Sequence, residues 1–283
     1  MRGDIALRPP AAQLPAASRI VSWLQDVWVL TRRNLIHVRR EPQQLSDVTI
    51  QPVIFTLLFV YVFGAALAAK AGGDFKAFLI PGLLVMNLTT STVGTAIGLS
   101  TDLSTGVINR LRTLPMAQTS ILVGRSISDL LAAVLCGAFV VVTGLAIGWR
   151  PDAGAGSILA GIGIALFFSY ALTWFNACIG LGMKSPEAAQ GVVFVIMFPL
   201  SFVSNIFTPT QGMPGWVGAI ANWNPVSAVA SACRTLFGAP NPSAAVNAWP
   251  MQHPVTAALM WAFAILVVCA PVAGWLYRRK TRN

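Results

Sequence analysis

The chain of 283 residues is 55% hydrophobic and only 10% charged. Soluble domains carry about 25% charged residues, so this composition excludes a water-soluble globular protein. The 19 Lys and Arg outnumber the 9 Asp and Glu, which gives a formal net charge of +10. Such an excess fits either a nucleic-acid-binding face or the basic cytoplasmic loops of a membrane protein, and the positions of the charges decide between them.

The N-terminal part precedes any membrane-spanning segment. Its first residues lack the apolar run of a secretory signal, so we expect a disordered cytoplasmic tail over 1–17. Residues 18–47 then place Trp and aliphatic side chains mostly on one helical stripe, opposite Gln and Arg. This pattern predicts an amphipathic helix in the plane of the membrane interface. An ordinary juxtamembrane anchor is the alternative.

Six later segments are long and apolar enough to cross a bilayer, which takes about 20 residues. The sequence therefore predicts an all-α, polytopic membrane protein with a transmembrane domain over 48–277 and a basic tail over 278–283. The predicted spans are 48–69, 78–100, 126–148, 157–183, 188–207 and 254–277.

The basic residues are divided unequally between the two sides of this topology. An even number of spans puts both termini on one side, together with the loops at 101–125 and around Lys184. That side holds 15 of the 19 Lys and Arg, and the other side holds Lys70, Lys76, Arg150 and Arg234. Because Lys and Arg concentrate in cytoplasmic loops, both termini are expected to be cytoplasmic.

Two connecting segments stand out. In the cytoplasmic loop 101–125, Gly106 permits a break before a short apolar stripe, and Pro115 ends that stripe. An amphipathic helix here could insert into a cleft on a soluble partner, or it could be a plain interfacial connector. Segment 208–253 combines six prolines with three tryptophans, which predicts short interfacial or re-entrant helices on the extracytoplasmic side of the membrane. A plain surface loop is the alternative.

If this membrane protein transports a compound actively, the energy for transport must come from outside the chain. No GxxxxGK[ST] phosphate loop occurs, and no cytoplasmic piece is long enough for a nucleotide-hydrolysing domain. The middles of the spans lack ionisable residues, which argues against ion coupling and against an intramembrane enzyme. Asp129 comes closest, and Arg125 four residues earlier is positioned to pair with it. Scattered cysteines and two distant histidines make a metal site unlikely to form.

The order of these features resembles the membrane subunit of type-2 ABC exporters, in particular the daunorubicin/doxorubicin-resistance permeases of actinobacteria. Beyond the amphipathic helix and six spans, the motifs that carry the resemblance are GVINRLRTLPM from Gly106, IPGLLVMN from Ile80 and NPVSAVASACRTLFG from Asn224. The resemblance implies a permease without its own ATPase activity, at the plasma membrane. It would export hydrophobic or amphipathic compounds such as drugs, antibiotics or lipids.

The resemblance also implies partners: two ATPase chains, which would bind ATP and Mg²⁺, and a second permease copy or a related permease. No cofactor is expected on this chain. ATPase docking would fall on the short helix after the break. Just before that helix, Asp102 stands alone in place of the family's acidic cluster. The expected docking residues are Gly106, Val107, Ile108, Asn109, Arg110, Leu111, Arg112 and Leu114.

A path for the transported compound would need many weak apolar and polar contacts. Candidate residues come from the second and fifth spans, and packing between helices is the alternative role for each of them. They are Asn87, Thr92, Thr95, Phe198, Phe202 and Asn205. Alternatives for the function as a whole are an ABC exporter of glycans or lipid-linked glycans and, further away, a gradient-driven carrier.

Overall fold

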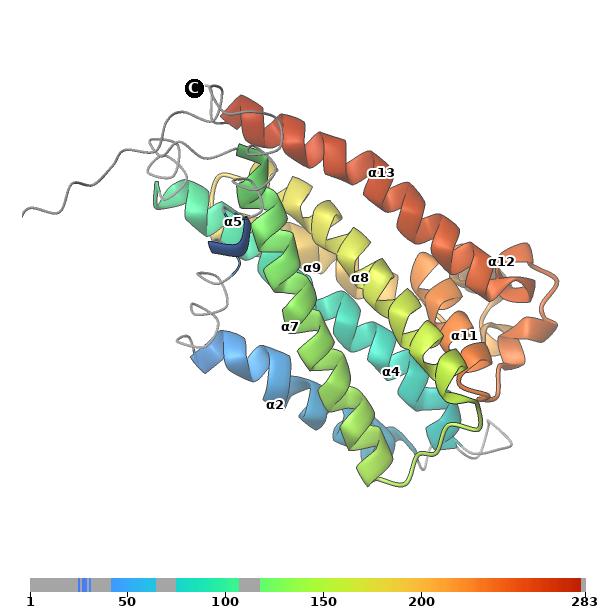
Figure 1. The fold of residues 1–283 in the computed structure, drawn as a ribbon. Coiled ribbons are helices and arrows are strands. Elements are labelled where there is room, and N and C mark those ends of the chain that lie inside the picture. Colours follow the sequence, from blue (N-terminus) through green and yellow to red (C-terminus); the bar gives the residue numbers. More distant parts are fainter. Residues whose placement is uncertain are drawn as a thin grey trace, which may run out of the picture.

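The computed structural model describes residues 25, 27–29, 31, 42–64, 75–106 and 118–280. These parts are helical, and no β-strand occurs in them (Figure 1). The α-helices are α2 (Pro42–Leu58), α4 (Phe75–Ser91), α5 (Val93–Ser104), α7 (Gln118–Ala146), α8 (Ala155–Gly182), α9 (Pro186–Phe202), α10 (Gly215–Trp223), α11 (Pro225–Leu236), α12 (Trp249–Gln252) and α13 (Pro254–Lys280). Short π and 3₁₀ segments are η2 (Phe59–Phe63), η3 (Thr210–Gly212) and η4 (Pro242–Ala245).

Five stretches of the described chain are long and apolar enough to cross a membrane, and α9 is a shorter apolar helix of 17 residues. The long stretches are 45–62, 75–104, 122–146, 155–182 and 254–280. The all-α, multi-pass fold expected from the apolar runs is therefore correct. The predicted interfacial helix over 18–47 lies mostly outside the described residues, and α2 already begins at Pro42.

The second stretch is two helices joined at Thr92. Four hydroxyl residues in a row, Thr89 to Thr92, donate to main-chain carbonyls three or four residues earlier. Such bonds compete with the helix ladder and bend it. At the break, the amides of Thr92 and Thr95 donate to carbonyls only three residues back. The expected span over 78–100 thus falls within one apolar stretch, 75–104, that contains a break at Thr92.

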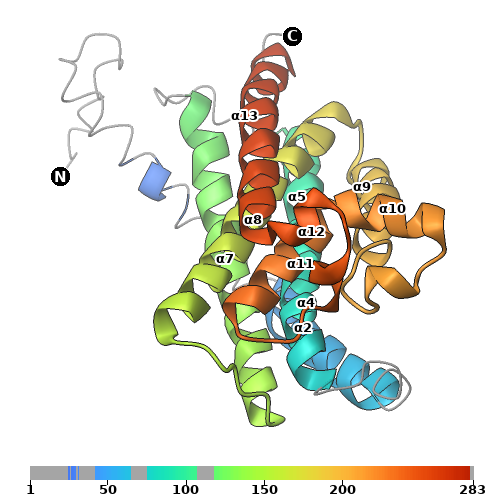
Figure 2. The same ribbon diagram turned by 90° about the vertical axis from the view of Figure 1, so that its right-hand side faces the viewer.

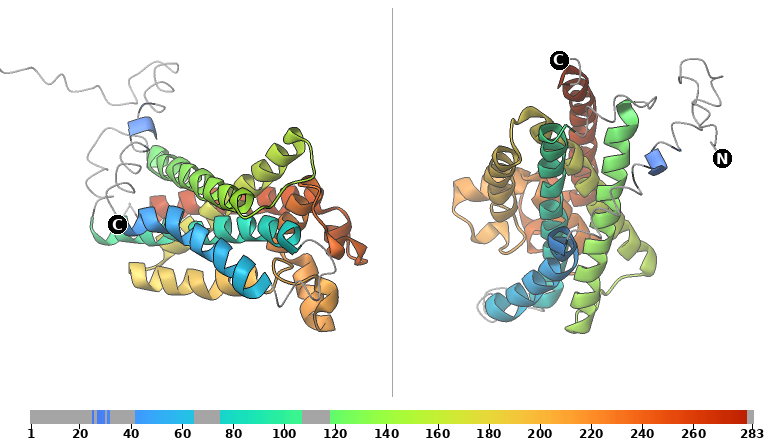
Figure 3. Two further views of the ribbon diagram at one scale, coloured as in Figure 1. Left: turned by 90° about the horizontal axis from the view of Figure 1, so that it is seen from below. Right: turned by 90° about the vertical axis from the view of Figure 1, so that its left-hand side faces the viewer.

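Helix α4 is the centre of the molecule. It is buried on all sides from Phe78 to Thr89, which explains why it is apolar all round rather than amphipathic. Figure 2 shows α7 on one side of the α4–α5 rod and α9 with α10 on the other, and the views in Figure 3 agree. Large apolar side chains on the outer faces of α2, α7, α9 and α13 remain exposed, as a lipid-facing belt requires.

Close helix crossings depend on glycine at a few points. A Cβ at Gly180 of α8 would overlap the main chain of Ala96 in α5, and one at Gly161 would lie 2.6 Å from the Phe237 ring beyond α11. Small residues of this kind let helices approach in membranes. In the described parts of the chain, these two contacts bring α8 directly against α5 and α11.

The segment between α9 and α13 is partly interior. Helix α11 is buried over nine consecutive residues, Val226–Arg234, in contact with α4, α8 and α13. A plain surface loop is therefore excluded for α11. Arg234, counted above on the extracytoplasmic side, lies in this helix and is fully buried. Trp216, Trp223 and Trp249 are exposed, as interfacial residues would be.

Candidate functional site: the α5–α7 junction

Helices α5 and α7 precede and follow residues 107–117 in the chain, and the two helices contact each other. Helix α5 ends in a Thr105 amide bond to Thr101 O (2.9 Å), and Gly106 follows with φ +70°. Glycine is the usual residue in this left-handed conformation just after a helix. The structure therefore places Gly106 at the break expected from the sequence. The other docking residues, Val107, Ile108, Asn109, Arg110, Leu111, Arg112 and Leu114, lie outside the described residues.

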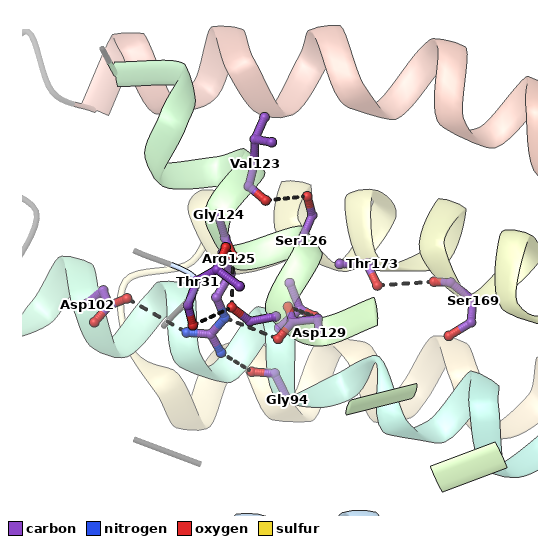
Figure 4. A network of polar contacts seen from close by, with 12 residues as sticks. Thr31, Gly94, Asp102, Val123, Gly124, Arg125, Ser126, Asp129, Ser169 and Thr173 are labelled. Carbon is purple, nitrogen blue, oxygen red and sulfur yellow. Dashed lines mark hydrogen bonds and ion pairs between the residues drawn. The ribbon is translucent and has the colours of Figure 1, made fainter. Parts of the chain in front are cut away.

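Arg125 of α7 joins the two helices at this junction (Figure 4). Its Nε lies 3.4 Å from Asp129 Oδ1 on the same helix, and its Nη1 lies 3.8 Å from Asp102 Oδ2 on α5. Nη2 donates to the Gly94 carbonyl of α5 at 3.1 Å. The side chains of the three charged residues are between 18% and 28% exposed, so water screens these contacts only in part. One cation thus contacts both helices on either side of the 107–117 segment.

Together with Gly94 and Thr95, the three charged residues form what we call the junction cluster. Its members are Gly94, Thr95, Asp102, Arg125 and Asp129. The Thr95 hydroxyl donates to Asp129 Oδ2 at 2.7 Å, which is a short, charge-assisted bond between α5 and α7. Beside it lies a small cavity with room for about one water molecule, lined in part by Thr173 and Trp174 of α8. The cluster therefore lies among three helices.

The N-terminal segment also contacts α7 next to the junction cluster. The Thr31 hydroxyl donates to the Gly124 carbonyl (3.2 Å), and Ser128 Oγ lies within bonding distance of Thr31 O (3.3 Å). Thr31 and Val27 are buried, whereas Trp28 is 66% exposed. Thr31 is thus attached through its hydroxyl and its main-chain carbonyl to the helix that carries Arg125.

The candidate path residues are not brought together. The Asn87 side chain donates to the carbonyl of Leu83 in the same helix, and the Thr92 hydroxyl accepts from the buried side-chain amide of Asn176 on α8. Thr95 belongs to the junction cluster, and Asn205 is fully buried against α11. These four side chains have partners within the helix packing.

Phe198 and Phe202 are different, because both are more than 40% exposed on α9. With Phe194 they form a stripe at a spacing of four residues, and successive ring centroids are 5.2 and 4.2 Å apart. Phe207 continues the stripe to Phe59 of η2, at a centroid distance of 4.7 Å. An aromatic ladder exposed on one helix face can contact flat apolar molecules, lipid tails or another subunit.

The spacing of four residues predicted the Arg125–Asp129 ion pair but not the other members of the junction cluster. Asp102 and Thr95 precede Arg125 by 23 and 30 residues, and only the packing of α5 against α7 brings them close. The lone Asp102 before the loop was the available signal.

A family model for the ABC-2 type transporter matches residues 25–237, which include the junction cluster and the helices that hold it. The chain belongs to this family. It is 33% identical over 274 residues to the daunorubicin resistance ABC transporter permease protein DrrB1 of Streptomyces coeruleorubidus, covering 96% of this chain and 92% of that protein. It is 23% identical over 266 residues to the doxorubicin resistance ABC transporter permease protein DrrB of Mycobacterium tuberculosis (89% and 88% covered). The resemblance to drug-resistance permeases expected from the sequence motifs is thereby confirmed.

Proposed function

We propose that this chain is the permease subunit of an ATP-driven exporter that moves hydrophobic or amphipathic compounds across the plasma membrane. The observation that carries the proposal is the likeness to a daunorubicin resistance permease over almost the whole chain. The absence of a phosphate loop in the sequence supports a separate ATPase, which would bind ATP and Mg²⁺.

The junction cluster supports a route for coupling in this proposal. Segment 107–117 would lie on the cytoplasmic face and dock to the ATPase. Arg125 contacts both flanking helices, so a displacement of that segment would move α5 and α7 together rather than separately. Coupling of this kind needs a contiguous set of packed groups between the two sites.

The exposed aromatic stripe on α9 supports the substrate class. Phe194, Phe198 and Phe202 form a stack of exposed rings without a charged residue among them. Such a surface favours planar apolar compounds over strongly hydrated ones. A second permease copy could cover part of the same stripe, with the path formed between the two.

The test is reconstitution of the tagged chain with the ATPase that co-purifies with it, in vesicles, with daunorubicin as the transported probe. We expect uptake that requires ATP and persists after an ionophore abolishes ion gradients. Arg110→Glu combined with Leu111→Asp should abolish ATPase recovery, whereas Lys280→Glu at the C-terminal end of α13, outside the docking segment, should not. Uptake by the permease alone, without nucleotide, would exclude the proposal.

A further inference from the structure

Arg234 is a fully buried cation on α11, and this helix lies at the opposite end of the molecule from α5 (Figure 1). Its Nε donates to Phe78 O of α4 at 2.9 Å, and its Nη2 donates to the carbonyls of Asn205 (2.9 Å) and Ile206 (3.0 Å) after α9. The guanidinium also lies 3.8 Å from the centroid of the Phe78 ring. Within the described residues Arg234 has no carboxylate partner, and Nη1 is without a hydrogen bond.

Arg234 is the last member of a polar stripe on α11 that contacts the end of α9. The Asn224 side-chain amide donates to Leu200 O (2.7 Å) and to Val203 O (2.6 Å). The main-chain amide of Asn205 donates to Ser227 Oγ (3.0 Å), and the Asn205 side chain donates to Ser231 Oγ (2.6 Å). The stripe consists of Asn224, Ser227, Ser231 and Arg234, spaced three or four residues apart and therefore on one side of the helix.

These contacts satisfy main-chain groups that the end of α9 leaves without helical partners. The last carbonyls of any helix lack intrahelical donors, and Leu200 O and Val203 O at the end of α9 are groups of this kind. Three members of the stripe are uncharged and bond to the end of α9, and Ser231 also donates to Met251 Sδ of α12 at 3.7 Å. Only Arg234 reaches α4 as well, because its planar guanidinium carries donors that point in several directions.

Isolated charge in a membrane protein interior is costly, and such residues are commonly functional. The packing around Arg234 leaves no spare room: a Cβ at Gly82 of α4 would lie 3.0 Å from Nη2 and 3.0 Å from Ile206 O. The guanidinium is therefore held between α4 and the turn after α9 with little freedom to reorient.

We propose that Arg234 is a positioning residue for transport, which fixes the turn after α9 to α4 so that α4, α11 and the end of α9 move as one unit. The inference rests on the proposed function, because the motion it concerns is that of the transport cycle. Helix α9 carries the exposed aromatic stripe and packs along α5, the helix that leads to Gly106. The break at Thr92 separates α5 from α4. Arg234 therefore connects the end of α9, which packs along α5, to α4 on the other side of that break.

The test compares Arg234→Gln, Arg234→Lys and the unmodified chain, each assembled with its ATPase in vesicles and assayed with daunorubicin. We expect the maximal uptake rate of Arg234→Gln to fall about tenfold, with KM for daunorubicin and the ATPase rate little changed. Arg234→Lys should recover part of the rate, because an ammonium can still donate to one or two of the carbonyls. Hydrogen exchange of amides 203–207 should become faster in Arg234→Gln.

A second variant tests the same position with the charge intact. Gly82→Ala forces the Arg234 guanidinium or Ile206 to shift, so it should also lower uptake more than ATPase activity. Gly163→Ala in α8 is the matched control, because a Cβ there meets nothing within 4 Å. If Arg234→Gln does not fold, Gly82→Ala and Arg234→Lys still provide the test.

The outcomes separate this inference from the proposed function. Uptake by the unmodified complex together with normal, coupled uptake by folded Arg234→Gln and Gly82→Ala would overturn the positioning role. A parallel loss of uptake, ATPase rate and unfolding temperature would overturn it too, because that is the signature of a purely structural residue. Failure of the unmodified complex to take up daunorubicin under ATP would instead contradict the proposed function.

Discussion

At the scale of single residues, Gly98 shows how tightly the junction cluster is packed. Any Cβ at this position of α5 would overlap the Arg125 guanidinium. We therefore expect Gly98→Ala to lower the free energy of unfolding by about 1–3 kcal/mol, as overpacking of an interior site does. Denaturation in detergent micelles, followed by tryptophan fluorescence, measures this change.

Gly94→Ala is the control for Gly98→Ala. Both replace a glycine of α5 with alanine, but a Cβ at Gly94 has open space around it. Its carbonyl can still accept from Arg125, so this variant should be as stable as the unmodified chain or slightly more stable. Equal destabilisation by both substitutions would show that Gly98 is not specifically in contact with Arg125.

The two carboxylates of the junction cluster should differ in their effects on stability. Asp129 accepts a short bond from Thr95 and lies at 3.4 Å from Arg125, whereas Asp102 contacts Arg125 only at 3.8 Å. Asp129→Asn should therefore cost about 1–3 kcal/mol, and Asp102→Asn less than about 1 kcal/mol. The same denaturation assay ranks them, and a larger loss for Asp102→Asn would contradict the geometry.

At the scale of elements, the aromatic stripe of α9 gives a prediction about substrate binding. Phe198→Ala removes a ring that stacks on Phe202 and is 47% exposed. If the stripe contacts the transported compound, KM for daunorubicin should rise about two- to tenfold while the maximal rate changes little. Uptake in vesicles with the partner ATPase measures both constants.

Ile196→Ala is the control for Phe198→Ala. Ile196 is also exposed on α9, at 38%, but it is two residues from both Phe194 and Phe198 and therefore lies on the other side of the helix from the stripe. Its truncation should leave KM unchanged. A similar rise in KM for both variants would indicate a general effect on α9, and no change for Phe198→Ala would remove the stripe from the substrate path.

Several helices followed directly from the sequence, because long apolar runs allow few alternatives in a bilayer. The break at Thr92 depends on hydroxyl groups that bond locally, a signal that was visible in the run of four hydroxyl residues but does not by itself specify a break. The burial of α11 was beyond the sequence pattern. Arg234 bonds to Phe78, 156 residues away, and only tertiary packing brings the two together.

At the scale of the whole molecule, the two polar clusters lie at opposite ends. The junction cluster joins α5 to α7 beside Gly106, and the α11 stripe joins α9 to α4. Between them lies an apolar core in which α8 contacts α4, α5 and α11. A motion of segment 107–117 would thus have to pass through packed apolar helices before it reached the end of α9.

The orientation of the whole chain gives the last prediction. With both termini cytoplasmic, the exposed residue Ala244 of η4 should face outward and Lys280 of α13 should face inward. In a chain whose four native cysteines are replaced by alanine, Ala244→Cys should react with a membrane-impermeant maleimide on intact cells. Lys280→Cys should react only after permeabilisation. The reverse pattern would mean that the unequal distribution of Lys and Arg does not set this topology, and segment 107–117 could then not dock to a cytoplasmic ATPase.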